Sequence, residues 1–255
     1  MVDASGDQRI GFPHLHVRRC GSTNDLARAL AARGAPHGTL VTADEQTAGR
    51  GRQGRSWTAP PGSSLLASFL LRPQRPPSGL FALAVALATA EACEELVPGL
   101  EVGVKWPNDL VVAGRKLAGI LIEGRPQESW LVVGIGVNVT LRPEQLAPEL
   151  VDRATSLALE AERLGRRVPV PSELATALCT TLARWTEPSG LERVTAVWPS
   201  RDVLAGHTVR WSSGSGIAEG IDEQGRLRVR VGEQEITLAA GEVHLGTGEA
   251  PAETH

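Results

Sequence analysis

The chain has 255 residues, 42% of them hydrophobic, which suits one large domain or one domain with a small appendage. A formal net charge of −3 argues against a general polyanion-binding protein, and the lack of a long apolar run or an apolar N-terminal segment argues against membrane insertion and secretion. Cys20, Cys93 and Cys179 lie far apart and outside any Cys/His cluster, which argues against a disulfide framework or a zinc site and favours reduced thiols in the cytoplasm.

The first elements in the chain surround a segment rich in glycine and arginine. Residues 1–13 are predicted to be a disordered lead-in. Ser22–Asp25 offer several capping side chains before a run rich in Ala and Leu, which predicts a helix over Leu26–Arg33. Thr39–Ala43 has the composition of a strand, and Thr47–Thr58 has no apolar periodicity, which indicates a loop.

The centre of the chain predicts a sheet covered by helices. Strands are expected at Ser64–Leu71, Val102–Trp106 and Trp130–Val139. Leu110–Val112 and Lys116–Glu123 flank a glycine-containing turn and predict a hairpin. Helices are expected at Ser78–Leu96, Leu157–Leu164, Pro171–Trp185 and Leu191–Trp198.

The character of the sequence changes at about Ala205. Turn residues now separate short alternating runs, at His207–Trp211, Gly216–Ile221, Leu227–Val231 and Glu235–Ala239. This spacing predicts a small all-β unit of four or five strands, of the kind found in SH3-like barrels.

The segment most suggestive of a binding site is Gly49-Arg50-Gly51-Arg52-Gln53-Gly54-Arg55. Its glycines permit close approach of a ligand to the backbone, and its arginines supply planar, permanently charged donors for phosphate or carboxylate groups. On its own the segment is a weak indicator, because a solvated basic loop or an RNA-binding segment has the same composition.

Further motifs give the loop a context. Lys105-Trp106-Pro107-Asn108-Asp109, Arg115–Leu121 and Gly134–Asn138 all lie at the ends or turns of predicted strands, where ligand groups commonly sit. Together with Ser22-Thr23-Asn24 and Gln46, these motifs occur in the order found in biotin–protein ligases, also called holocarboxylase synthetases. The chain resembles that family from about residue 14 to about residue 246. Lipoate–protein ligases share the general fold but are not associated with this combination of motifs.

The resemblance implies a fold and an activity. The fold is α+β, with a class II aminoacyl-tRNA-synthetase-like mixed sheet flanked by helices and a small C-terminal SH3-like β-barrel. The implied domains are a biotin- and ATP-binding catalytic domain over residues 14–203 and the barrel over 204–248, followed by a disordered tail over 249–255. The implied activity uses ATP and Mg²⁺ to form biotinyl-5′-AMP and then transfers biotin to a lysine of a biotin carboxyl carrier domain of a carboxylase.

The resemblance also implies which residues bind biotin. These are polar residues that complement a ureido group, loop residues that close over the ligand, and two positions in the RKLAGIL motif: Ser22, Thr23, Asn24, Gln46, Gly49, Arg50, Gly51, Arg52, Trp57, Lys116 and Gly119. The alternative for Ser22–Asn24 is helix capping, and the alternative for Trp57 is core packing.

By the same resemblance, the adenylate is contacted by Arg52, Trp57, Asn108, Lys116 and Asn138. Arg52 and Lys116 are the implied catalytic cations, together with Mg²⁺. Asp109 is a candidate to orient the acceptor amine or to accept its proton, but it could equally cap the turn after Pro107. No metal ligand is identified from the sequence.

The expected partners follow from the same comparison. Only 21 residues precede Ser22, too few for the winged-helix domain of the bifunctional family members, so no DNA binding is expected. A monomer or a weak homodimer is expected, with no membrane contact. Three rivals remain open: a lipoate or octanoyl transferase, a nucleic-acid-binding regulator, and an interaction module with an inactive ligase core.

Overall fold

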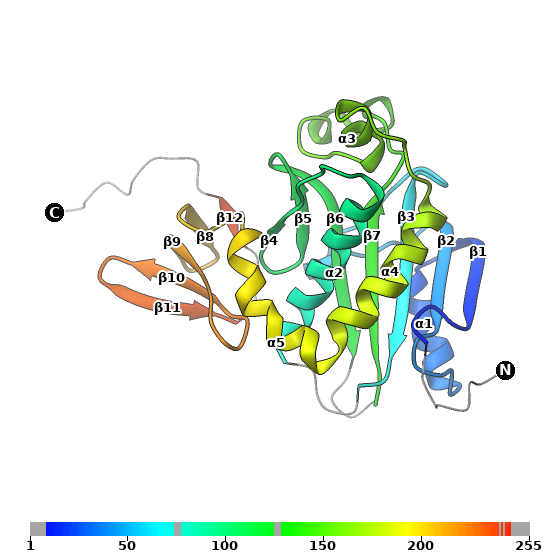
Figure 1. The fold of residues 1–255 in the computed structure, drawn as a ribbon, viewed down its shortest axis with the longest axis horizontal. Coiled ribbons are helices and arrows are strands. Elements are labelled where there is room, and N and C mark those ends of the chain that lie inside the picture. Colours follow the sequence, from blue (N-terminus) through cyan, green and yellow to red (C-terminus); the bar gives the residue numbers. More distant parts are fainter. Residues whose placement is uncertain (1–8, 74–77, 125–128, 240, 242, 246–255) are drawn as a thin grey trace.

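The structure is a computed structural model that describes residues 9–73, 78–124, 129–239, 241 and 243–245. Its main sheet has seven strands (Figure 1). In spatial order they are β1 (His14–Cys20), β2 (Leu40–Gln46), β3 (Ser64–Leu71), β7 (Leu131–Asn138), β6 (Arg115–Gly124), β5 (Asp109–Val112) and β4 (Gly103–Lys105). β1 pairs with β2 in parallel and every other pair is antiparallel, so the predicted mixed sheet is confirmed.

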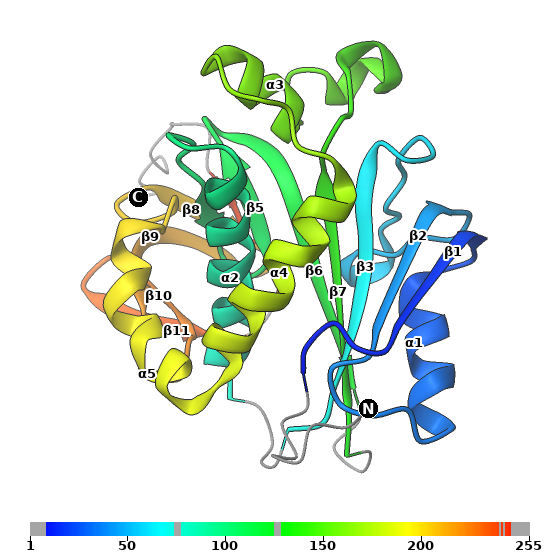
Figure 2. The same ribbon diagram turned by 45° about the vertical axis from the view of Figure 1, so that its right-hand side comes forward.

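Helices cover the two faces of this sheet unequally (Figures 1 and 2). The long apolar helix α2 (Leu80–Leu96) packs with α4 (Pro171–Thr186) and α5 (Pro188–Val197) on one face. On the other face α1 (Thr23–Ala32) lies against β2, β3 and β7. α3 (Leu157–Arg163) follows two short 3₁₀ turns, Pro143–Gln145 and Pro148–Leu150. None of the helices described here has both the length and the apolar character that crossing a bilayer requires.

The alternation of side chains along the central strands explains where a ligand can enter. Leu65, Ala67 and Phe69 of β3 point into the core beneath the α2–α4 layer. The residues between them point to the α1 face, where part of the strand surface has no helix over it. On that face β6 and β7 carry glycines at positions 119, 134 and 136, and Gly119 pairs directly with Gly136. The missing side chains leave room above the middle of the sheet.

The C-terminal unit is a five-stranded antiparallel sheet. In spatial order it contains β11 (Gln234–Leu238), β10 (Leu227–Val231), β9 (Gly214–Ile221), β8 (Thr208–Trp211) and β12 (His244–Leu245). Among the described strands β11 and β12 do not pair with each other, so the sheet is not closed and the expected SH3-like barrel is not confirmed. Trp106 Nε1 donates to the carbonyl of Gly225 at 3.0 Å, which joins this unit to the main sheet.

The sequence interpretation missed β1 and β12. β1 is an edge strand with a mostly exposed burial pattern, and its apolar alternation is limited to Leu15 and Val17, a run too short to have been used as a signal. Of the predicted lead-in, residues 1–8 lie outside the described part of the chain, as does the predicted tail over 249–255. Residues 9–13 do belong to the fold, because Ile10 is buried in the core and Gly11 N donates to Gly38 O at 2.8 Å.

Candidate active site

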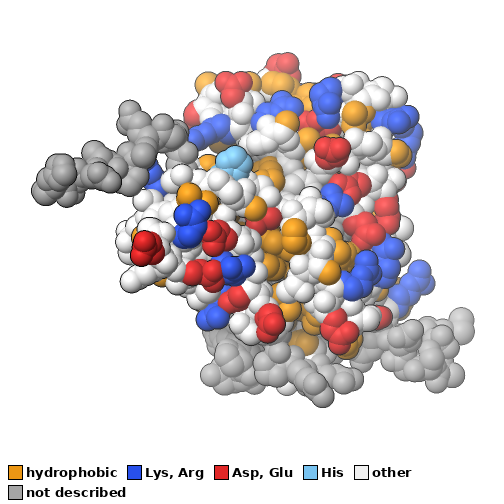
Figure 3. Space-filling model, turned by 60° about the vertical axis from the view of Figure 1, so that its left-hand side comes forward, with side chains coloured by type: hydrophobic (Ala, Val, Ile, Leu, Met, Phe, Trp, Pro, Cys, Tyr) orange, Lys and Arg blue, Asp and Glu red, His pale blue; other side chains and the backbone are white. Residues whose placement is uncertain are grey.

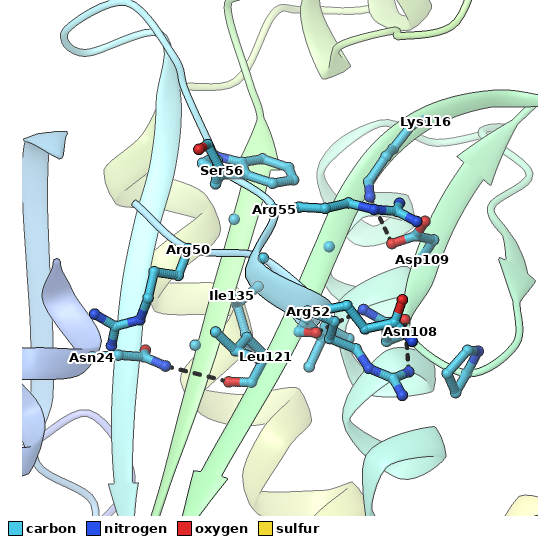
Figure 4. Close-up of a pocket in the computed structure, with 18 of the residues that line it drawn as sticks. Asn24, Arg50, Arg52, Arg55, Ser56, Asn108, Asp109, Lys116, Leu121 and Ile135 are labelled. Carbon is cyan, nitrogen blue, oxygen red and sulfur yellow. Dashed lines mark hydrogen bonds and ion pairs between the residues drawn. The ribbon is translucent and has the colours of Figure 1, made fainter. Parts of the chain in front are cut away.

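The principal pocket lies over the glycine-bearing part of the sheet, beneath the loop that follows β2 (Figure 4). Its walls come from the start of α1, the loop of residues 50–57, the β4–β5 connection and the middle of β6 and β7. Segments far apart in the sequence, including both predicted motifs at residues 105–109 and 116–121, therefore meet in one cavity. Gly241 and Val243 of the C-terminal unit complete the lining.

One end of the pocket is a cradle of uncharged polar side chains. Ser22, Thr23 and Asn24 are only 4%, 3% and 4% exposed. Gln46 Oε1 accepts hydrogen bonds from the backbone N of Thr23 at 2.7 Å and from its hydroxyl at 3.0 Å. Ser68 Oγ lies 2.8 Å from Thr23 Oγ1 and 2.6 Å from Asn24 Oδ1. These bonds fix the positions of donors and acceptors in a site that excludes most water.

The structure at the start of α1 bears on the alternative that Ser22–Asn24 serve only to cap a helix. Ser22 occupies the position before the first helical turn, but its side chain makes no capping hydrogen bond. The helix begins at Thr23, three residues earlier than predicted, so Thr23 and Asn24 lie in its first turn. The buried polar groups here are therefore turned to Gln46, Ser68 and the pocket rather than to the end of the helix.

The loop folds into a narrow hairpin with a short 3₁₀ turn at Arg52–Gly54. Gly51 N donates to Arg55 O at 2.7 Å and Trp57 N donates to Gly49 O at 2.9 Å. Gln53 has φ of 55°, the left-handed conformation that side-chain-bearing residues rarely adopt. A backbone held in this way places the arginines on either side of the pocket.

The loop arginines point to opposite ends of the cavity (Figure 4). Arg50 turns to α1, where its guanidinium donates to both carboxylate oxygens of Asp25 at 2.7 and 2.9 Å and to Glu123 Oε2 at 3.2 Å. Hydrogen bonding from Arg50 holds the pKa of Asp25 below its usual range. Arg52 turns the other way and donates to Asn108 Oδ1 at 3.2 Å.

The second end of the pocket is strongly cationic. Lys116 Nζ donates to Asp109 Oδ1 at 2.7 Å and lies 5.7 Å from the centre of the Trp57 ring. Arg52 and Lys105 also line this end, and burial lowers the pKa of each. Asp109 is the one carboxylate among the described lining residues. An excess of partly buried cations beside a single carboxylate favours an anionic ligand with more than one charge.

Trp57 forms a lid on the glycine-bearing strands. A Cβ placed on Gly136 would lie 2.6 Å from the indole, and one on Gly119 would lie 3.1 Å from it. The indole Nε1 is buried, and it is the single such side-chain atom of the described residues that has no hydrogen-bond partner. Since buried donors are normally paired, this N–H indicates that an acceptor belongs in the pocket.

Two of the predicted site residues lie outside the pocket lining. Asn138 is 6% exposed, and its amide donates to the carbonyl of Thr155 at 3.0 Å, which ties the end of β7 to the segment before α3. Gly49 packs against the backbone at the other end of the loop, where a Cβ on Gly49 would lie 2.3 Å from the carbonyl oxygen of Trp57. The other predicted residues line the pocket together.

The sequence interpretation missed other residues at the site. They include Lys105, Gly134 and Gly136 in the pocket lining, with Glu123 behind Asn24 and Arg50. One signal could have identified Lys105. The chain has 26 basic residues, yet only Lys105 and Lys116 are lysines, and the structure brings both into the same pocket. In a chain that otherwise uses arginine, this placement points to a requirement for the compact ammonium group.

No group of three or more His, Cys, Asp or Glu side chains suited to holding a metal occurs within the described ranges. The lining is instead suited to Mg²⁺ that arrives with a polyphosphate. That ion commonly takes most of its ligands from phosphate and water, with one or two carboxylates. Asp109 is the lining residue with the donor type to contribute.

Comparison with known proteins identifies the chain. A model of the biotin/lipoate A/B protein ligase family matches residues 17–139, and a model of the biotin protein ligase C-terminal domain matches residues 212–246. A biotin–[acetyl-CoA-carboxylase] ligase from Mycobacterium tuberculosis is 36% identical over 241 residues, covering 90% of this chain and 88% of that protein. The chain belongs to the biotin protein ligase family. A bifunctional ligase/repressor, BirA of Bacillus subtilis, is 33% identical over 88% of this chain and 71% of that protein.

A solved structure of another biotin protein ligase has a similar fold. The enzyme from Aquifex aeolicus, in complex with biotin and ATP, superposes with a TM-score of 0.76 at 28% identity, covering 91% of this chain and 98% of that chain. This agreement extends over both the main sheet and the C-terminal unit of the biotin protein ligase described here.

The loop gives a first prediction for this biotin protein ligase. Because residues 50–56 hold their place by a few polar contacts, we expect biotin with MgATP to slow tryptic cleavage after Arg50, Arg52 and Arg55 severalfold. Cleavage after Arg167, in the exposed segment between α3 and α4, is the internal control. Equal cleavage rates at the loop with and without ligands would show that ligands do not order it.

Proposed function

We propose that this chain activates biotin with ATP and transfers it to a lysine of a biotin carboxyl carrier domain, with both steps in the pocket described above. The observation that carries the proposal is the division of that pocket. An uncharged polar cradle lies at one end and a cluster of cations at the other, under one loop. A ligand with a neutral polar head and an anionic tail that meets a nucleotide fits this division.

The polar cradle is proposed to hold the ureido ring of biotin. That ring has two N–H donors and one carbonyl acceptor, and the hydroxyls and amides of Ser22, Thr23, Asn24 and Gln46 can serve both. Arg50, Gly51 and Gly119 line the same pocket and are proposed to enclose the ring. The buried N–H of Trp57 would then donate to the bound intermediate.

The cationic end is proposed to carry the first step. An oxygen of the biotin carboxylate bonds to the α-phosphorus of ATP as the bond to the pyrophosphate oxygen breaks, giving biotinyl-5′-AMP. Both reactants are anions, so Arg52 and Lys116 must offset charge at the reacting phosphate. Mg²⁺ bound to ATP supplies further neutralisation of the phosphates. Asn108, which accepts a hydrogen bond from Arg52, orients that guanidinium.

In the second step the acceptor amine bonds to the acyl carbon and AMP leaves with the electron pair. The amine must first lose a proton, because a free lysine has a pKa of about 10.4. We propose that Asp109 orients the amine and takes that proton once the nucleotide draws Lys116 away from it. Its present bond to Lys116 is at 2.7 Å.

The remaining assignments extend this proposal. We propose a catalytic domain over residues 14–203 and a C-terminal domain over 204–248, with class II synthetase-like and SH3-like folds respectively. The acceptor is a carboxylase carrier domain, the compartment is the cytoplasm, and the assembly is a monomer or weak homodimer that binds neither DNA nor membranes. Against nucleic-acid binding, basic and acidic side chains are interspersed over the face in Figure 3. In the C-terminal unit Arg226 pairs with Asp222 and Arg228 pairs with Glu235.

Release of pyrophosphate tests the proposed activity before any carrier is present. The enzyme should release one equivalent per active site in a burst when biotin and MgATP are added together. Lipoate or octanoate should give no burst. A burst with lipoate and none with biotin would assign the site to the lipoate branch of the wider family.

Lys105 gives a second prediction. Lys105→Met should raise the KM for MgATP roughly tenfold to a hundredfold, because a charge-assisted hydrogen bond contributes about 1.5–3 kcal/mol. Lys105→Arg should restore only part of the affinity, since the planar guanidinium of arginine does not replace the compact ammonium of lysine. Steady-state kinetics at saturating biotin would measure both variants, and an unchanged KM in Lys105→Met would remove this residue from the nucleotide end.

A further inference from the structure

Glu123 lies outside the pocket, yet it contacts residues from two different parts of it. It stands near the end of β6, two positions beyond Leu121, so its side chain emerges on the same face as Gly119 and the pocket. That side chain is 23% exposed. Its Oε2 accepts a hydrogen bond from Asn24 Nδ2 at 2.7 Å and another from Arg50 at 3.2 Å. One carboxylate oxygen therefore joins the polar cradle to the loop.

The contact with Asn24 determines which way its amide faces. A carboxylate offers acceptors alone, so the NH₂ of Asn24 must face Glu123. The amide oxygen then faces Ser68 Oγ, which is 2.6 Å away. Gly134 leaves the space for this arrangement, because a Cβ there would lie 2.4 Å from Asn24 Oδ1. The carbonyl of Leu121 accepts from the same Nδ2 at 3.5 Å, so without a carboxylate at position 123 the amide keeps only this longer contact to fix its orientation.

The contact with Arg50 fixes the loop. Its guanidinium is shared between Asp25 and Glu123, and Arg28 also approaches Asp25 and lies 3.8 Å from Glu123. Within the described part of the chain, the polar contacts of the Asp25 side chain are with Arg28 and Arg50, whereas Glu123 contacts these arginines and Asn24 as well. The two acids thus anchor the same loop residue, but only Glu123 also reaches the polar cradle.

We infer that Glu123 is a positioning residue that couples the orientation of the Asn24 amide to closure of the loop through Arg50. The inference rests on the proposed role of the polar cradle in binding biotin. Biotin that engages Asn24 favours the amide orientation that Glu123 accepts, and the same oxygen then holds Arg50 over the ligand. Loop closure thereby becomes a response to an occupied cradle.

Matched variants separate this coupling from simple anchoring. Glu123→Gln removes the negative charge that Asn24 and Arg50 share, and leaves one neutral amide oxygen, a weaker acceptor, for both bonds. Asp25→Asn weakens the anchor of Arg50 and leaves Asn24 untouched. Ser68→Ala removes a contact to Asn24 and leaves the loop untouched. Thermal unfolding of each variant checks that it folds.

The measurements are the Kd for biotin by calorimetry and tryptic cleavage after Arg50 at saturating biotin. Glu123→Gln should raise the Kd about tenfold and should also lose protection of Arg50 even when biotin is saturating. Asp25→Asn should leave the Kd within about twofold of the wild type, and Ser68→Ala should raise the Kd while keeping full protection at saturation. These effects in combination would support the coupling.

Other results would overturn it. If Glu123→Gln behaves like Asp25→Asn, with an unchanged Kd, Glu123 is an anchor for the loop and no more. If Glu123→Gln keeps wild-type protection at saturating biotin, the two contacts are independent. Failure of the wild-type enzyme to bind biotin would instead refute the proposed function, so the two failures are distinguishable.

Discussion

Replacing Lys116 with alanine is expected to slow adenylation by roughly a hundredfold to a thousandfold, equivalent to about 3–4 kcal/mol in the barrier. The reason is that its ammonium lies at the cationic end of the pocket, 2.7 Å from Asp109, and we propose that the α-phosphate binds at this end. Supplying chemically made biotinyl-AMP should bypass most of the defect. The paired measurement is pyrophosphate release from biotin and MgATP, and carrier labelling from the preformed adenylate.

The neighbouring residue provides the control. Arg115 is adjacent on β6, but its guanidinium donates to the buried Glu160 at 2.8 Å, away from the pocket. Arg115→Ala should therefore lower the stability of the fold and leave pyrophosphate release almost unchanged. In Lys116→Ala the stability should change by about 1 kcal/mol or less, because the ion pair is partly solvated. Normal pyrophosphate release by Lys116→Ala would place this lysine outside the chemistry.

Gly136→Ala is expected to release the adenylate roughly fivefold to a hundredfold faster. A methyl group at this position would lie 2.6 Å from the Trp57 ring. Overpacking of this kind costs about 1–3 kcal/mol. Because Trp57 is at the end of a loop, the clash should be relieved by opening of the loop rather than by distortion of β7. Chase of labelled biotinyl-AMP from the enzyme measures the rate.

Gly21 supplies a matched control for that variant. It lies immediately before Ser22, and a Cβ there would meet no atom within 4 Å. Gly21→Ala should release the adenylate at the wild-type rate. If Gly136→Ala releases the adenylate as slowly as Gly21→Ala, the packing of Trp57 against the glycines of β6 and β7 does not retain the intermediate.

The extent to which the fold could be predicted depended on burial. β3 and α2 are surrounded by apolar neighbours, and the predicted ends of β3 agree with the structure. β1 lies exposed at the edge of the sheet, and only the short alternation of Leu15 and Val17 marks it in the sequence. The pairing order of the strands also lay beyond the sequence, because it depends on contacts between distant segments such as β3 and β7.

The site could be predicted where a motif carries its own chemistry. The arginines of the loop and Lys116 were identified in this way, and the structure places them in one pocket. Asn138 is also part of a motif, but its amide donates to the carbonyl of Thr155 and so holds the chain that follows β7. Glu123 was missed because a carboxylate near the end of a strand looks like surface until the fold brings Asn24 and Arg50 to it.

The most direct test of this account is the mass of a biotin carboxyl carrier domain incubated with the enzyme, biotin and MgATP. We expect the mass to rise by that of one biotinyl group, attached to a single lysine, and to stay unchanged when ATP is omitted or lipoate replaces biotin. A carrier that keeps its original mass with active enzyme, biotin and MgATP, or that gains a lipoyl group instead, would contradict the assignment.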